Sequence, residues 1–183
     1  MFGQNITIRN IIAIFERESQ DVLGMLDDLE EAIKNLQYEG KVSWGKNTKA
    51  IEKVVSFLRK KLLEHIQLDE DVIFPYAQKH IPKLESMIYF LRAERNEFKQ
   101  NLENFELLFK QLRLEKNNQR QQKIIDQLKE KGIYVICLVR NHIQTEIESV
   151  YKSMDTQLHQ DERKILVRKC LQFKLNPFRQ KKS

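Results

Sequence analysis

The sequence predicts an all-α protein folded as an antiparallel, up-down four-helix bundle with an extended C-terminal helix. The composition favours long helices over strands and tight turns, because it is 41% hydrophobic and 32% charged with only 5 glycines and 3 prolines among 183 residues. Apolar residues recur at helical spacing along four long stretches of the chain. Two segments of the first half are repeated in the second half, which indicates two similar helical hairpins.

The first two helices are predicted in the N-terminal half of the chain. Apolar residues at helical spacing run from Ile6 to Leu36, and the glycine-containing segment 38–47 ends this helix. The second helix is expected to begin near Asn47, a good N-cap residue, and to extend to about Gln78. Pro75 is expected to kink or shorten its last turns, because proline lacks a backbone N–H.

The other two helices are predicted in the C-terminal half. The third runs from about Lys83 to Leu114. The fourth is longer, from about Gln121 to Phe173, with an interruption expected near Gly132. We therefore expect a bundle over residues 1–173 and a basic tail over residues 174–183.

An internal repeat pairs these helices in halves. A segment that begins at Glu18 is repeated at Glu94, and one that begins at His65 is repeated at His142 at nearly the same offset. Two independent segments that agree on one offset indicate two hairpins related by pseudo-symmetry.

Two histidine–carboxylate pairs lie on the predicted core faces of the second and fourth helices. His65 and Asp69 are four residues apart, as are His142 and Glu146, so each pair shares one helix face with apolar residues. Buried ionisable groups must be paired, neutralised or bound to a cation. Imidazole and carboxylate ligands suit iron, manganese or zinc, and helical bundles build two-metal sites from them. These four residues are the candidate metal ligands.

The segment His65-Ile66-Gln67-Leu68-Asp69-Glu70-Asp71-Val72-Ile73-Phe74-Pro75 resembles the His-x-x-x-Glu-Glu, Leu-Phe-Pro segment of the hemerythrin-like, or HHE cation-binding, family. The segment around His142 resembles the second such motif of that family. The family uses five histidines and two carboxylates to hold two bridged, non-haem irons, in dioxygen carriers, sensors, and proteins that handle iron or nitric oxide. The resemblance implies one or two irons and the ligands His65, Asp69, His142 and Glu146, with Asp69 where glutamate is usual.

Three ligand positions depart from the family pattern, one of them because no second histidine stands near His142 to complete the set. Ser19 stands where the first-helix histidine is expected, and Arg95 stands where the third-helix histidine is expected. Arginine cannot ligate a metal, but its guanidinium can fork onto Asp69 or Glu146 and supply the positive charge that iron would give.

The acidic residues Glu18 and Glu94 precede these two positions. A small rotation of their helices would turn both carboxylates inward as additional ligands, as in di-iron carboxylate bundles. Without that rotation they are ordinary charges at the edge of the buried face.

Three interpretations therefore stay open. The first is an iron-binding protein with an incomplete ligand set, used for sensing, storage or redox work rather than reversible dioxygen carriage, with a small diatomic molecule as its ligand. The second is a metal-free bundle that acts as a structural or protein-interaction module, its pocket closed by Arg95 salt bridges. The third, an oxidase-like enzyme, requires Glu18 and Glu94 as ligands.

The composition excludes other classes of protein. The net charge of +6 owes much to four basic residues of the tail, and the body lacks a nucleic-acid recognition motif, so no nucleic-acid partner is expected. No apolar run is long enough to span a membrane and no signal peptide is recognised, which predicts a soluble, cytoplasmic protein. No phosphate loop or nucleophile elbow occurs, so ordinary hydrolase or transferase chemistry is not expected.

Overall fold

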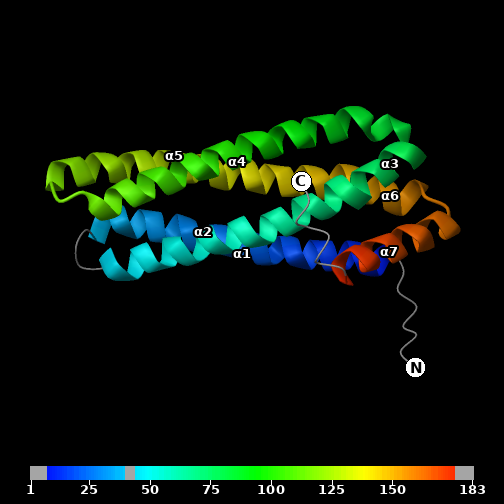
Figure 1. Cartoon of the computed structure of the whole chain (residues 1–183), viewed down its shortest axis with the longest axis horizontal. Coiled ribbons are helices and arrows are strands. Elements are labelled where there is room, and N and C mark those ends of the chain that lie inside the picture. Colours follow the sequence, from blue (N-terminus) through cyan, green and yellow to red (C-terminus); the bar gives the residue numbers. More distant parts are fainter. Residues whose placement is uncertain (1–7, 40–43, 176–183) are drawn as a thin grey trace, which may run out of the picture.

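The computed structural model describes residues 8–39 and 44–175, and its long helices lie side by side as an elongated bundle (Figure 1). No strand occurs in these ranges. The prediction of an all-α bundle is confirmed. The elements in chain order are α1 (Ile8–Glu39), α2 (Trp44–Leu68), the π-helix η1 (Asp69–Ile73), α3 (Phe74–His80), the 3₁₀ turn η2 (Pro82–Leu84), α4 (Glu85–Leu114), α5 (Asn118–Glu146), the π-helix η3 (Ile147–Tyr151), α6 (Lys152–Gln157) and α7 (Gln160–Leu175).

These elements form four antiparallel arms and one added helix. α1 is the first arm, α2 continues through η1 into α3 as the second, α4 is the third, and α5 continues through η3 into α6 as the fourth. α1 packs against both α2 and α5, and α4 packs against α5. α7 folds back against α1 and η1 at one end of the bundle (Figure 1). It includes Lys174 and Leu175, so the part of the predicted tail that lies outside the described residues is 176–183.

The break predicted near Gly132 is wrong. α5 passes through Gly132 without interruption, and the fourth arm ends instead at Leu158, whose backbone is extended. Gly132 allows close packing of α5 against neighbouring side chains and does not break the helix. A Cβ atom there would clash with Ile33 Cδ1 and would lie 3.0 Å from Phe105 Cε2.

Pro75 does not shorten the second arm either. It lies in the first turn of α3, where a missing N–H costs little, and the helical path continues to His80. The π-helix η1 immediately precedes α3, and the π-helix η3 occupies the corresponding place in the fourth arm. Each begins at or directly after the acidic residue of a predicted pair, Asp69 or Glu146. The two halves thus share an irregularity of a kind that is frequent at functional sites.

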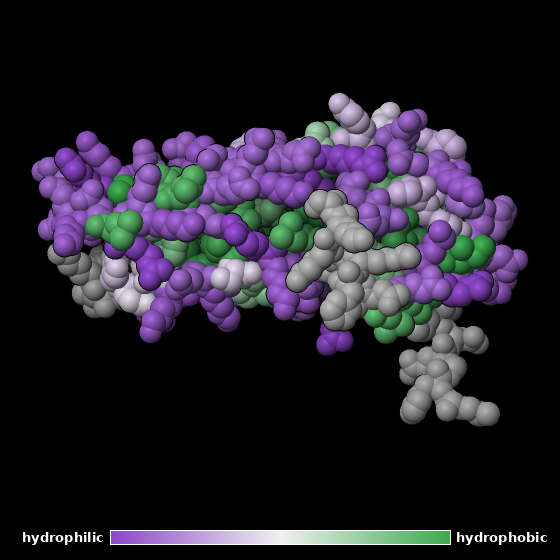
Figure 2. Space-filling model, viewed as in Figure 1, coloured by the Kyte–Doolittle hydropathy of each residue, from purple (hydrophilic) through white to green (hydrophobic). Residues whose placement is uncertain are grey.

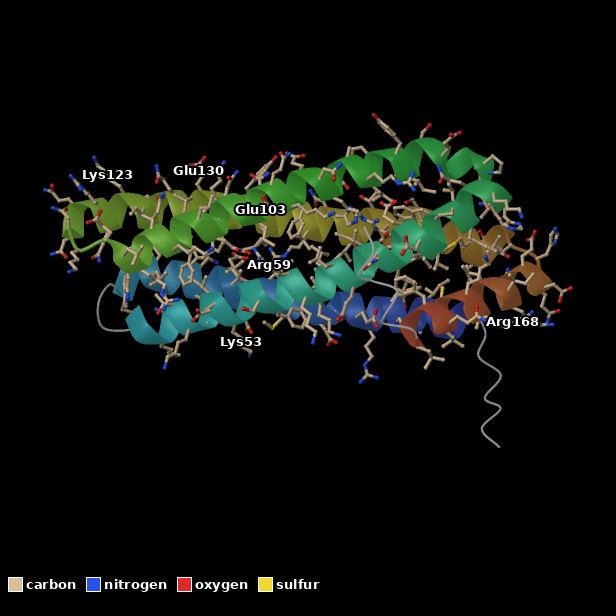
Figure 3. The ribbon with its side chains drawn as sticks, viewed as in Figure 1. Lys53, Arg59, Glu103, Lys123, Glu130 and Arg168 are labelled. Carbon is tan, nitrogen blue, oxygen red and sulfur yellow. The ribbon has the colours of Figure 1, made fainter. Side chains whose placement is uncertain are left out.

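The core has two apolar clusters along the bundle. One lies among α1, α2, α4 and α5, and the other gathers α3, α6 and α7 around the end where the π-helices lie. The visible face is mostly hydrophilic, with apolar patches between the helices (Figure 2), and charged side chains such as Lys123 and Glu130 point away from the bundle (Figure 3). Among the described helices, none has the length and apolarity needed to cross a membrane.

Candidate metal centre

The structure brings the two predicted histidine–carboxylate pairs together between the two apolar clusters. His65 Nε2 lies 2.9 Å from Glu146 Oε2 and 3.2 Å from Asp69 Oδ2. The two acidic residues are only 0% (Asp69) and 1% (Glu146) exposed, so their charges must be compensated by their neighbours. The i, i+4 spacing thus positions His65 and Asp69 as the sequence predicted, and the tertiary fold adds Glu146.

Arg95 of α4 occupies the centre of this cluster. Its Nη2 donates to Asp69 Oδ2 at 2.5 Å and to Glu146 Oε1 at 2.8 Å, and its Nε donates to His142 Nε2 at 3.2 Å. The guanidinium carbon lies 4.4 Å from the centre of the Phe74 ring, and the residue is 3% exposed. Stacking and forked hydrogen bonds are what the planar guanidinium does best.

A further set of side chains surrounds the cluster. The Tyr151 hydroxyl donates to Asp69 Oδ1 at 3.3 Å, and Glu94 Oε2 lies 3.1 Å from His142 Nδ1. Glu70 Oε1 accepts a hydrogen bond from Arg95 Nη1 at 3.3 Å. From the sequence, neither Tyr151 nor Glu70 was given a role in the site. The available signal for Glu70 was its place directly after Asp69, in the acidic pair of the motif.

Glu18 does not turn inward. Its carboxylate accepts a hydrogen bond from Lys174 Nζ at 2.7 Å at the surface, as expected for a charge at the edge of the buried face rather than for an additional ligand. Ser19 is buried beside the cluster at 6% exposure, and no hydrogen bond of its hydroxyl is found among the described residues. Of the two additional ligands considered, only Glu94 reaches the cluster, through His142.

The charges of the cluster set its pKa values. Burial lowers the pKa of His65, but the carboxylates of Asp69 and Glu146 outweigh burial and raise it to about 9. Burial and the neighbouring Glu146 carboxylate raise the pKa of Asp69 to about 7. Burial would also raise the pKa of Glu146, but His65 and Arg95 outweigh it and lower this pKa to about 2. Burial lowers the pKa of His142, with a contribution from Arg95, which favours a neutral ring that accepts from the guanidinium.

Among the described residues, one set of donor atoms is grouped closely enough to hold a metal ion. One donor atom each from His65, Asp69 and Glu146 lies within 4.8 Å of the others, which is the spacing of ligands around a single ion. A second ion would need the carboxylate and imidazole lone pairs that Arg95 already engages. A guanidinium cannot be deprotonated at ordinary pH and therefore cannot give way by losing its charge.

The comparison with known protein families agrees with this geometry. The model of the hemerythrin HHE cation-binding domain matches residues 10–154, which include both motif helices and leave α7 outside. No curated protein matches the chain in sequence. Since the family model covers most of the chain, from α1 into α6, the protein belongs to the hemerythrin HHE cation-binding domain family.

Proposed function

We propose that this chain is a hemerythrin-like metal-binding module that holds a single ion, such as non-haem iron, for sensing, storage or redox work. The observation that carries the proposal is the convergence of donor atoms from His65, Asp69 and Glu146 within 4.8 Å of one another. One imidazole and two carboxylates form a donor set suited to iron, manganese or zinc. The ion would exchange for the proton that His65 holds at neutral pH.

In this proposal Arg95 stands in for a second ion. It supplies a fixed positive charge to Asp69 and Glu146, and it engages His142, which would otherwise be free to bind metal. Carriage of dioxygen by two irons is therefore not proposed. A two-iron oxidase is not proposed either, because Glu18, which that interpretation needs, is paired with Lys174.

One observation favours a second candidate, a metal-free bundle that serves as a structural or protein-interaction module. Every carboxylate oxygen of the two buried acids has a hydrogen-bonding partner within the protein: Tyr151 and Arg95 for Asp69, and Arg95 and His65 for Glu146. The positive charges of Arg95 and protonated His65 compensate the negative charge of these two acids. Such a cluster is stable without a cation if its geometry is maintained.

Metal analysis separates the two candidates. The full chain is purified without chelator, loaded anaerobically with ferrous iron, desalted, and assayed by mass spectrometry beside His65→Ala and His80→Ala. His80 is the matched control, because it pairs with Glu162 outside the cluster. We expect about one iron per chain in the parent and in His80→Ala, and a loss of most of it in His65→Ala. A parent chain that retains no iron refutes the metal proposal and supports the metal-free bundle.

A further inference from the structure

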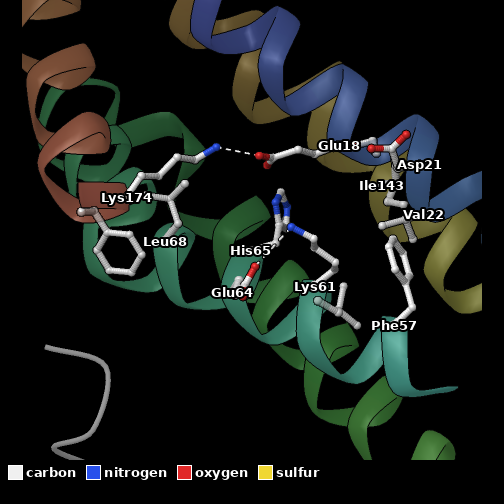
Figure 4. A pocket seen from close by; sticks show the side chains of 13 residues that line it. Glu18, Asp21, Val22, Phe57, Lys61, Glu64, His65, Leu68, Ile143 and Lys174 are labelled. Atoms are coloured by element: carbon white, nitrogen blue, oxygen red, sulfur yellow. Dashed lines mark hydrogen bonds and ion pairs between the residues drawn. The ribbon is translucent and has the colours of Figure 1, made fainter. Parts of the chain in front are cut away.

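A cavity of about 350 Å³ lies beside His65, among α1, α2, α5 and α7 (Figure 4). This volume is within the range of about 300–1,000 Å³ that is typical of small-molecule sites. Arg95 does not line the cavity, so the cavity is distinct from the salt-bridged centre of the cluster. Its walls are largely apolar, formed by Val22, Phe57, Leu62, Leu68, Ile143 and Phe173.

The cavity also contains two hydrogen-bond donors that have no partner among the described residues. Ser19 lines the cavity although it is 6% exposed, and its hydroxyl makes no hydrogen bond there. His65 also lines it, and only its Nε2 is engaged, by Asp69 and Glu146. Its Nδ1 therefore faces the cavity without a partner, and it is a donor whenever it carries a ring hydrogen. A donor that faces the cavity without a partner in the protein is available to an acceptor group of a ligand.

The charges at the mouth of the cavity are largely neutralised in pairs. Lys174 Nζ lies 2.7 Å from Glu18 and Lys61 Nζ lies 3.5 Å from Glu64 (Figure 4), which leaves Asp21 as an exposed carboxylate at the rim. An exposed charge is screened by water, whereas the donors inside are not. The donors inside the cavity, rather than the charges at its rim, therefore decide which end of a ligand is buried.

We propose that this cavity binds a small amphipathic carboxylic acid. Its carboxylate accepts hydrogen bonds from Ser19 and His65, and its apolar body packs between Phe57 and Phe173. A carboxylate is the acceptor favoured here, because charge-assisted hydrogen bonds are stronger than neutral ones. Phe173 and Lys174 belong to α7, so one wall of this site lies outside the region that the family model matches.

The test uses three probes with the same eight-carbon chain: octanoate, octan-1-ol and octylammonium. Each is titrated into the chelator-treated full chain by isothermal calorimetry, and the contacted residues are mapped by amide chemical shifts. We expect saturable octanoate binding, with shifts around Ser19, and binding at least about tenfold weaker for octanol and octylammonium. Tighter binding of octylammonium would mean that the acidic rim sets the specificity, and it overturns the proposal. Absence of saturable octanoate binding overturns it as well.

Paired variants assign the contacts. Ser19→Ala should weaken octanoate binding about tenfold, whereas Ser56→Ala, at an exposed position of α2, should not change it. Phe173→Ala should weaken it several-fold, whereas Phe90→Ala, at a half-exposed position of α4 outside the cavity, is neutral. Equal effects of the cavity and control variants refute the assignment. Because the protein is free of metal throughout, failure of the metal proposal leaves this result unaffected.

Discussion

The Arg95→Leu substitution tests whether the guanidinium maintains the buried cluster. It leaves Asp69 and Glu146, at 0% and 1% exposure, with protonated His65 as their main source of positive charge. Removing one partner from a buried ion pair costs about 3–5 kcal/mol, because the remaining charge is buried without compensation. We therefore expect the free energy of unfolding to fall by about 3–5 kcal/mol, measured by urea denaturation with circular dichroism at pH 7.5 in the presence of chelator.

Arg92→Leu is the matched control on the same helix. Arg92 also pairs with Glu70 and also lies over the Phe74 ring, but its side chain is 36% exposed and that of Glu70 is 34% exposed. Exposed pairs of this kind contribute about 0–1 kcal/mol, so the loss should stay below about 1 kcal/mol. If the two variants lose the same free energy of unfolding, or if Arg95→Leu is as stable as the parent, then the Arg95 guanidinium does not maintain the buried cluster.

Three further results are expected. Arg95→His should increase ferrous iron uptake in the metal assay, because it replaces a repelling cation by a ligand; unchanged metal content counts against this reading. The pKa of His65 in the folded protein, about 9, exceeds its ordinary value of 6.5, so the stability it contributes is complete below pH 6.5 and is lost as the pH rises through 9. Urea denaturation in the presence of chelator should show a loss of about 3 kcal/mol in the free energy of unfolding over this pH range. In His65→Gln the free energy of unfolding should depend much less on pH. If it depends on pH as it does in the parent, the loss does not come from His65. Gly132→Ala should destabilise the protein by about 1–3 kcal/mol and so lower its midpoint of thermal unfolding. Gly24→Ala should be neutral or stabilising, because a Cβ added there meets no atom within 4 Å.

The fold could be predicted from the sequence because helical periodicity is a local property. Apolar spacing and the repeat were enough to find four arms and their order. Gly132 was misread because glycine both ends helices and permits close packing, and the choice depends on Ile33 and Phe105, which come from other helices. Glu18 could not be placed from its own helix either, since its partner Lys174 lies on α7, at the other end of the sequence.

The candidate site could be predicted from the sequence where the chain keeps the regular period of an α-helix. His65 and Asp69 lie within one regular turn, and the tendency of Arg95 to fork onto carboxylates follows from its chemistry. The role of Tyr151 could not be predicted with an α-helical period, because Tyr151 is the last residue of η3, which begins directly after Glu146. Hydrogen bonds in a π-helix span five residues instead of four, which changes the face on which the following side chain lies.

The repeat explains why the two halves of the centre now differ. Ser19 and Arg95 occupy equivalent positions in the repeated segments, as do His65 and His142. Arg95 fills its half with a guanidinium, and His142 accordingly accepts a hydrogen bond as a neutral ring. Ser19 has a short side chain that cannot fill the other half, and the cavity lies there beside His65. The difference in side-chain length and charge between these two equivalent positions thus fills one half of the centre and leaves a cavity in the other. The half beside His65 keeps the space and the donor atoms that a metal ion or a small acid would need.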